Sequence, residues 1–487
     1  MSQEKDILKS SIVQGFGTLI VREFFIKILA FLGQIFLARL LAPSDFGVYV
    51  IIVFIINLFS LFSDIGLNLA IIQKKEEPTH DELSSVFFVQ ILLSLGLIIL
   101  IWIFSPSIKL FYPTFINANV FMLRVFSITL LLTSFRSIPI SLLERKIKYN
   151  LISLLDIMGV LVYYVVSILG AFLGFGVWSF ILGAVIKEIV ETVVLYTIKP
   201  FVPQLKISIK NLKNMVKFGK YIQGNGLVGF LGTSITPVLG GRLIGPYAVG
   251  ILDFAFNIAS LPTTIGINFG RVAFAGYSRM QEQNKLLLNS INHSMSMLSI
   301  ILYIFPVIIF SFSNQLVPLI FSAKWIPSIP ALYWYSAVTF FIPIVSPFGQ
   351  GIFAIGKSKE IFWGTFITTF FGWIGAYFLI HLLGLLGIAI IYFLTVLSLC
   401  LFYIMIFKKN GFNFPILSIL GPKLIAVFII TLFSLIMNII LPQGIYILFF
   451  KLFISFMFYF ILMFILAKQD TVELFRLIMS LIKLKHI

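Results

Sequence analysis

The chain has 487 residues, of which 60% are hydrophobic and 11% charged. Soluble domains carry about 25% charged residues, so this composition excludes an ordinary soluble protein. The single cysteine, Cys400, excludes an internal disulfide, and the four histidines lack metal-ligand spacing. We therefore expect no metal site and no cofactor.

Long apolar runs fill almost the whole chain. A membrane-spanning helix needs about 20 such residues, and about fourteen candidates of that length occur. The first run is too long and too charged for a cleavable signal peptide. The sequence thus predicts an all-α polytopic membrane protein, with transmembrane helices at 12–37, 46–72, 83–105, 118–142, 151–173, 175–197, 216–240, 247–270, 290–312, 330–355, 361–382, 385–407, 416–441 and 444–467.

The net charge of +17 is distributed unevenly between the two faces of this topology. The loops on the face opposite the N-terminus contain only Arg39, Lys109, Arg242 and Lys324 as basic residues. Because basic loops stay in the cytoplasm, we expect both termini to be cytoplasmic. The positive charge is then a topology signal and gives no reason to expect nucleic-acid binding, although it also favours anionic lipid headgroups.

Two segments of the sequence recur about 200 residues apart, which indicates an internal duplication. FIINLFSLFSDIGLN (54–68) recurs as FAFNIASLPTTIGIN (254–268), and ARLLAPSDFG (38–47) recurs as GRLIGPYAVG (241–250). Six predicted helices separate the copies, so both enter the membrane from the same face. We therefore predict two parallel six-helix bundles related by a pseudo-twofold axis, as in some transporters.

The predicted domains follow from this repeat. They are an N-terminal bundle at 1–198, a basic cytoplasmic linker at 199–217, a C-terminal bundle at 218–410, and two additional helices with a cytoplasmic tail at 411–487.

Polar residues form a matching stripe on the second helix of each copy. At 100° per residue they fall within an arc of about 80°. Interhelical hydrogen bonding and the lining of a substrate path both remain open for the Asn and Ser positions. For Asp64 we favour function, because its counterpart in the second copy is the neutral Thr264. The stripes consist of Asn57, Ser60, Asp64 and Asn68, and of Asp253, Asn257, Ser260, Thr264 and Asn268.

Charged residues also occur inside the first apolar run. Glu23 and Lys27 are four residues apart and can pair, while Arg22 points about 100° away. Either Arg22 faces a cavity or the whole group is a neutralised structural cluster. Arg124 and Arg136 are further buried cations in the fourth helix.

Other charges have simpler interpretations. Arg39 and Arg242 lie at helix ends beside prolines, which favours structural anchoring. Lys187 and Glu191 have the spacing of a helical ion pair.

An excess of buried cations suits an anionic substrate, because guanidinium groups bind phosphate bidentately. No residue pattern suggests catalysis. The candidate substrate-binding residues are Arg22, Lys27, Arg124, Arg136, Asn57, Asn68, Asn257 and Asn268. The candidate ion-coupling residues are Asp64, Asp253 and Glu23.

The stretch FLARLLAPSDFGVYVIIVFIINLFSLFSDIGLNLAIIQKKE (36–76) resembles the start of polysaccharide exporters of the multidrug/oligosaccharidyl-lipid/polysaccharide superfamily. LGFGVWS (173–179) is similar to the helix 5–6 turn of that family. The resemblance implies a V-shaped cavity lined by helices 1, 2, 7 and 8, which opens alternately to either face. Two helices beyond twelve also occur in such flippases.

The implied substrate is an oligosaccharide on undecaprenyl pyrophosphate, flipped across the bacterial cytoplasmic membrane for surface polysaccharide such as O-antigen or capsule. Membrane lipids, a polysaccharide polymerase and a chain-length regulator are the implied partners. A peptidoglycan-precursor flippase and a cation-coupled drug antiporter remain alternatives. A membrane glycan polymerase is disfavoured, because the outward loops are short and poor in acids, so we expect no enzyme. Energy coupling by protons, sodium or membrane potential stays open.

Overall fold

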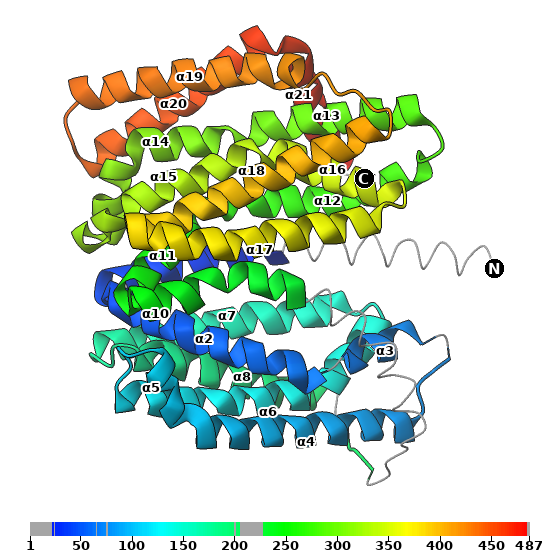
Figure 1. Cartoon of the computed structure of the whole chain (residues 1–487), viewed down its shortest axis with the longest axis vertical. Helices are drawn as coiled ribbons and strands as arrows, with labels where there is room; N and C mark the ends of the chain where they lie inside the picture. Colours follow the sequence, from blue (N-terminus) through cyan, green and yellow to red (C-terminus); the bar gives the residue numbers. More distant parts are fainter. Residues whose placement is uncertain are drawn as a thin grey trace. The chain divides into compact units, whose positions relative to one another are not determined.

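The computed structural model describes residues 22–23, 25–64, 66–74, 76–198, 201–204 and 227–484. Within these ranges the chain is helical and contains no strand, which confirms the predicted all-α membrane protein. The chain divides into two compact units, Met1–Gly250 and Ile251–Ile487 (Figure 1).

The first unit contains most of the first repeat and the beginning of the second. Residues 25–40 are helical, as are residues 227–233. The elements between and after them are α2 (Pro43–Asp64), α3 (Leu67–Gln73), α4 (His80–Phe104), η1 (Ser105–Ser107), α5 (Ile108–Phe111), α6 (Asn117–Arg145), α7 (Tyr149–Phe172), α8 (Trp178–Ile198), η2 (Thr236–Gly240), α10 (Gly241–Leu243) and the start of α11 (Pro246–Ala259).

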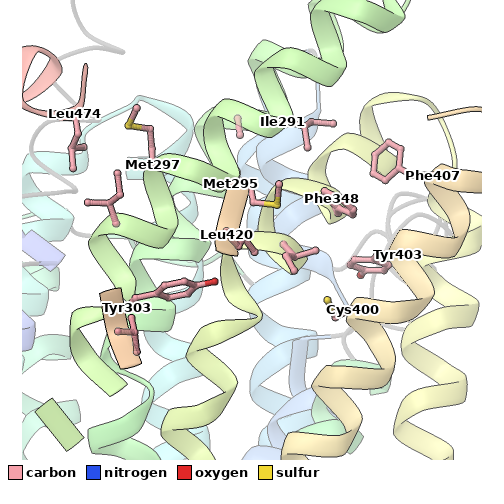
Figure 2. Close-up of a cluster of buried hydrophobic side chains, with 14 of the residues drawn as sticks. Ile291, Met295, Met297, Tyr303, Phe348, Cys400, Tyr403, Phe407, Leu420 and Leu474 are labelled. Atoms are coloured by element: carbon pink, nitrogen blue, oxygen red, sulfur yellow. The ribbon is translucent and has the colours of Figure 1, made fainter. Parts of the chain in front are cut away.

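The second unit packs its helices around a hydrophobic core with side chains from α12, α13, α14, α16, α17, α18, α19, α20 and α21 (Figure 2). Its elements are α12 (Leu261–Arg279), α13 (Asn284–Leu302), α14 (Ile304–Leu316), η3 (Val317–Phe321), η4 (Ala323–Ser328), α15 (Ile329–Ala337), η5 (Val338–Phe340), α16 (Ile342–Ala354), α17 (Ser358–Leu383), α18 (Leu385–Lys409), α19 (Ile416–Ile440), α20 (Ile445–Leu466) and α21 (Lys468–Leu484).

Membrane spans were predicted well in position. Nine helices of the described chain are long and apolar enough to cross a membrane, or eleven if each of two bent pairs forms one span. Of the three remaining predicted spans, 12–37 and 216–240 lie partly outside the described residues, and 175–197 corresponds to α8 with its three charged residues. The count of fourteen stays a prediction, as do the domain boundaries, because 205–226 are not described.

Several predicted spans are broken helices rather than single ones. The span expected at 46–72 ends as α2 at Asp64 and resumes as α3 at Leu67, because Gly66 adopts a left-handed conformation with φ 73°. In the second copy the break falls between α11 and α12, with a bend of 53°. Here Pro262 lies in the first turn of α12, where its missing N–H breaks no helical hydrogen bond.

The repeated Pro-x-x-x-Gly motifs of the two copies pack against each other inside the first unit. A Cβ on Gly47 would overlap the carbonyl of Pro246, and a Cβ on Gly250 would overlap the carbonyl of Pro43. The contact is therefore reciprocal, with backbone against backbone. Only glycine permits so close an approach of two helices, which is the usual role of small residues in membrane helix packing.

The second repeat is fixed to the first bundle by further contacts around this crossing. Tyr112 donates a hydrogen bond from its hydroxyl to the carbonyl of Pro237 at 3.2 Å. Arg242 donates to the carbonyl of Phe111 at 3.2 Å, and its guanidinium lies 4.7 Å from the Phe111 ring centroid. The structure thus agrees with the anchoring role expected for Arg242.

We predict that Gly47→Ala destabilises the protein, because the added methyl group must displace the Pro246 backbone. Overpacking of this kind costs about 1–3 kcal/mol. Gly96→Ala is the matched control, since Gly96 lies in the interior of α4 and a Cβ there would meet nothing within 4 Å. Thermal unfolding of the purified protein should show a lower midpoint for Gly47→Ala and an equal or higher midpoint for Gly96→Ala. Equal midpoints for the two variants would contradict the backbone contact.

Candidate functional site

The first unit contains a half-open cavity of about 480 Å³ between the helix at 25–40, α2, α6, α7 and α8. This volume lies within the range of small-ligand sites, and its lining mixes apolar and aromatic side chains with a few polar groups, as such sites do. The polar and aromatic lining consists of Tyr49, Asn57, Ser60, Phe126, Thr129, Thr133, Tyr163, Tyr164, Lys187 and Glu188.

Two residues of the predicted α2 stripe line this cavity. Ser60 donates its hydroxyl to the carbonyl of Asn57 in the same helix at 2.8 Å. The Asn57 side chain is exposed. Its amide can therefore both donate and accept hydrogen bonds toward a guest.

Glycines let the large side chains of the site lie close to neighbouring helices. The ring of Tyr164 lies where a side chain on Gly33 would be, and the carboxylate of Glu191 lies where a side chain on Gly159 would be. The second contact brings an acidic group of α8 directly onto the backbone of α7. Close packing of this hairpin thus positions the charged residues beside the cavity.

A charged cluster adjoins the cavity at Lys187 and Glu188. Arg136 of α6 donates to the carboxylates of both Glu188 and Glu191, and Lys187 lies 3.8 Å from each of these carboxylates. The predicted helical pair of Lys187 and Glu191 is confirmed. Arg136 and Glu191 are nearly buried, with side chains 13% and 5% exposed, so each charge depends on the other for compensation.

Arg22 is paired with carboxylates, which favours the neutralised cluster of the two alternatives left open by the sequence. Its guanidinium donates to Asp156 of α7 at 2.9 Å and lies 3.4 Å from Glu23. Glu23 therefore contacts Arg22, whereas the sequence suggested a pair with Lys27. Lys27 is exposed on the helix at 25–40. Both Arg22 and Arg136 act electrostatically on Asp156, so the two clusters form one network.

Asp64 lies at the break between α2 and α3. Its carboxylate accepts hydrogen bonds from the backbone N–H of Asn68 at 3.1 Å and from the side-chain amide of Gln90 at 2.7 Å. Gln90 also donates to the Asn68 side chain at 3.2 Å and accepts from Ser137. Asp64 thus stabilises the start of α3 and connects it to α4 and α6.

Arg124 lies apart from this network. It is twelve residues from Arg136 on α6, which corresponds to about 18 Å along the helix axis. Its guanidinium donates to the Ser105 hydroxyl at 2.8 Å and to the Trp102 carbonyl at 3.0 Å. A cation there complements the carboxyl end of α4. The structure therefore does not bring Arg124 together with Arg22 and Arg136.

The counterparts in the second unit form smaller groups. Asn257 donates to the Asp253 carboxylate at 2.8 Å within α11, and Asn268 is half-buried in α12. In the described chain no group of three or more His, Cys, Asp or Glu residues could hold a metal ion.

Sequence reasoning missed three members of the site in the first unit. Asp156, Gln90 and Ser137 each complete a hydrogen-bonded group around a residue that was singled out. The sequence did contain a signal for these residues, because each is a polar side chain inside an apolar run, and such a side chain usually faces a partner or a cavity. The sequence does not identify the partner, because the partner lies many residues away along the chain.

Comparison with known proteins decides the family. The model of the polysaccharide biosynthesis protein family matches residues 36–330. The chain belongs to this family. The Bacillus subtilis (strain 168) teichuronic acid biosynthesis protein TuaB is 23% identical over 314 residues, which cover 63% of this chain and 64% of TuaB. The lipopolysaccharide biosynthesis protein WzxC of Escherichia coli (strain K12) is 23% identical over 322 residues, with 65% of each protein covered.

The chain thus spans slightly less than two thirds of the length of these relatives.

Among solved structures, the lipid II flippase MurJ in an inward closed conformation aligns with 92% of this chain. The alignment covers 98% of the MurJ chain, with a TM-score of 0.76 and 18% identity. At that identity the likeness shows the fold. The family predicted from sequence is confirmed, and so is the multi-pass membrane fold.

We predict that Arg136→Ala lowers stability by about 3–5 kcal/mol, because it removes the cation that binds two nearly buried carboxylates directly and leaves them only Lys187, at 3.8 Å. Adding Glu191→Gln should recover part of this loss, so the double variant is more stable than the sum of the single effects. Lys146→Ala, at an exposed position just after α6, is the control and should be neutral. A thermal-unfolding cycle with strictly additive effects would rule out the coupling.

Proposed function

We propose that the protein is a flippase that exports undecaprenyl-pyrophosphate-linked oligosaccharides across the bacterial cytoplasmic membrane by alternating access. The cavity of the first unit carries this proposal, because it combines hydrogen-bonding and aromatic groups in a membrane protein of the polysaccharide biosynthesis family. The hydroxyl groups of a sugar can bind the hydrogen-bonding side chains, and its apolar ring faces can pack against the aromatic side chains. The chain acts as a transporter and not as an enzyme.

The names of the relatives support a glycan-related substrate. TuaB takes its name from teichuronic acid and WzxC from lipopolysaccharide, which are different glycans. A lipid carrier common to several glycans is consistent with one fold serving both. In this proposal both termini are cytoplasmic, and a polymerase and a chain-length regulator receive the exported units.

The charged network gives the pyrophosphate a binding mode. Arg22 and Arg136 already donate hydrogen bonds to carboxylates, and phosphate oxygens accept hydrogen bonds from guanidinium groups in the same way. A phosphate group could thus replace Asp156 or Glu188 as the acceptor, and the guanidinium group would keep a partner. Exposed Lys27 adds a further cation. Asn57 and Asn68 in the first unit, and Asn257 and Asn268 in the second, are the proposed contacts to sugar.

Two other transport functions remain as alternatives. The structure is similar to that of the lipid II flippase MurJ over nearly the whole chain, so the first alternative is a flippase for a peptidoglycan precursor. The second alternative is a cation-coupled drug antiporter. Deletion of the gene separates them by phenotype. Our proposal predicts loss of surface polysaccharide with normal growth, whereas lysis would indicate the precursor and drug sensitivity would indicate the antiporter.

We predict that Asn57→Ala and Lys27→Gln each reduce flipping of a labelled lipid-linked oligosaccharide in proteoliposomes. The loss of one hydrogen bond to sugar corresponds to about tenfold. Asn284→Ala, at an exposed position outside the cavity, is the matched control. Arg124→Gln tests the remaining candidate cation, which donates to Ser105 and Trp102: reduced flipping by the folded variant would support Arg124 as a substrate-binding residue, and an unchanged rate would remove it from the site. Wild-type rates in both Asn57→Ala and Lys27→Gln would contradict the proposed site.

Asp64 gives a separate prediction about energy coupling. If its carboxylate carries the coupling ion, Asp64→Asn should remove the response to an imposed proton or sodium gradient and leave equilibrating flipping intact. Gln90→Ala breaks the same hydrogen-bonded group while keeping the carboxylate, so it should retain the response. A response to membrane potential alone, unchanged in Asp64→Asn, would assign the coupling to the charge of the substrate.

A further inference from the structure

The chain ends in a helix, α21, where the sequence suggested only a cytoplasmic tail. α21 begins at Lys468, directly after α20 ends at Leu466. Thr471 donates its hydroxyl to the carbonyls of Met463 and Ala467 at 3.0 and 2.9 Å. Since α20 is long and apolar enough to cross a membrane, this short connection keeps the start of α21 at the membrane surface.

One side of α21 is fixed to the second unit by an ion pair between partly exposed Asp470 and buried Lys423. Asp470 accepts a hydrogen bond from the ammonium group of Lys423 of α19 at 2.7 Å and another from Ser296 of α13. Lys423 also donates to Ser296 at 2.7 Å and is only 1% exposed. Burial by itself raises the pKa of Asp470, but the hydrogen bonds and charge of Lys423 outweigh it, and the pKa lies below its usual value.

Two further contacts hold the same side of the helix. Leu474 is 8% exposed and joins the hydrophobic core of the second unit (Figure 2). Glu473 lies 3.6 Å from the ring of His293 of α13. α21 is therefore clamped at several points, and its orientation on the unit is defined.

The neighbouring side of α21 presents apolar side chains beside cations. Phe475 is 48% exposed and Met479 is 58% exposed. At 100° per residue these two lie about 40° apart, with Lys468 about 20° from Phe475 and Arg476 about 60° from Met479. Both cations are exposed, and the Lys468 ammonium lies 5.9 Å from the Phe464 ring centroid.

We propose that α21 is an interfacial helix that binds the anionic headgroups of the membrane spanned by the chain. Phe475 and Met479 enter the boundary between headgroups and acyl chains, and Lys468 and Arg476 contact lipid phosphates. Apolar side chains flanked by cations are the pattern of helices that lie in a lipid interface. The cations argue for an anionic lipid surface, because each gains attraction there.

This binding site is separate from the glycan-flipping function and does not depend on it. The clamp at Asp470 joins the lipid-bound helix to α13 and α19, two helices that line the core of the second unit. Anionic lipid should therefore stabilise this unit as a whole. The same lipids should have less effect when the two cations are removed.

A fluorescent label at Met479→Cys in the full-length protein tests the position of the helix. Glu473→Cys is the matched control, because Glu473 lies about 120° from Met479 around the helix and its side chain is 55% exposed. Cys400 is buried, and unlabelled wild type verifies that it does not react. In nanodiscs containing phosphatidylglycerol, the Met479 label should be quenched by lipid-borne quenchers and protected from iodide, and the Glu473 label should show the reverse. Equal iodide quenching at both positions would overturn the proposal.

The double variant Lys468→Gln/Arg476→Gln tests the lipid specificity without any label. Wild-type protein should unfold at a higher temperature in nanodiscs with phosphatidylglycerol than in phosphatidylcholine alone, and the variant should lose most of this difference. Each charge is worth about fivefold in affinity for the anionic surface, so half-maximal stabilisation should need several-fold more phosphatidylglycerol. Identical lipid dependence of wild type and variant would contradict the proposal.

Discussion

The first unit depends on the reciprocal contact between the two Pro-x-x-x-Gly motifs. Gly47 and Gly250 each receive the backbone of the other copy, so neither motif tolerates a side chain at the crossing. Helices in a membrane gain little from burying apolar surface, because lipid is equally apolar. Close backbone packing therefore has to supply the attraction. The duplication places the same small residue at both sides of one contact.

Charge compensation is the second constraint on this unit. Two of the cations that suggested a positively charged cavity, Arg22 and Arg136, are paired with carboxylates of α7 and α8. Paired charges in a low-dielectric interior are far less costly than isolated ones. They also remain available to a phosphate that replaces one carboxylate. The network sets the cations of Arg22, Arg136 and Lys187 against four carboxylates, so an anionic substrate binds in this proposal by replacing a carboxylate and not by meeting an excess of cations.

The sequence was sufficient for properties that depend on local pattern. Apolar runs located the spans, and the repeat identified Gly47 and Gly250 as equivalent positions. Helical projection brought Asn57 and Ser60 to the same face, and both line the cavity. The resemblance of residues 36–76 correctly indicated the family. Each of these inferences uses residues within one helix or compares one segment with another.

Pairings between distant residues could not be obtained in the same way. Arg22 and Asp156 are 134 residues apart, and Lys423 meets Asp470 only because α20 reverses the chain between them. A lone charge in an apolar run signals that a partner exists but does not identify it. The break between α2 and α3 could not be predicted from the sequence either. Gly66 adopts a left-handed conformation there, but a glycine permits this conformation without requiring it.

The central claim is that the lipid-linked glycan passes through the cavity of the first unit. Photocrosslinking in proteoliposomes tests it most directly, with a photoreactive group on the sugar nearest the pyrophosphate. Mass spectrometry should then locate adducts around Asn57 and Ser60 of α2 and Tyr163 and Tyr164 of α7. Adducts confined to other helices, in a preparation that flips the probe, would contradict the account.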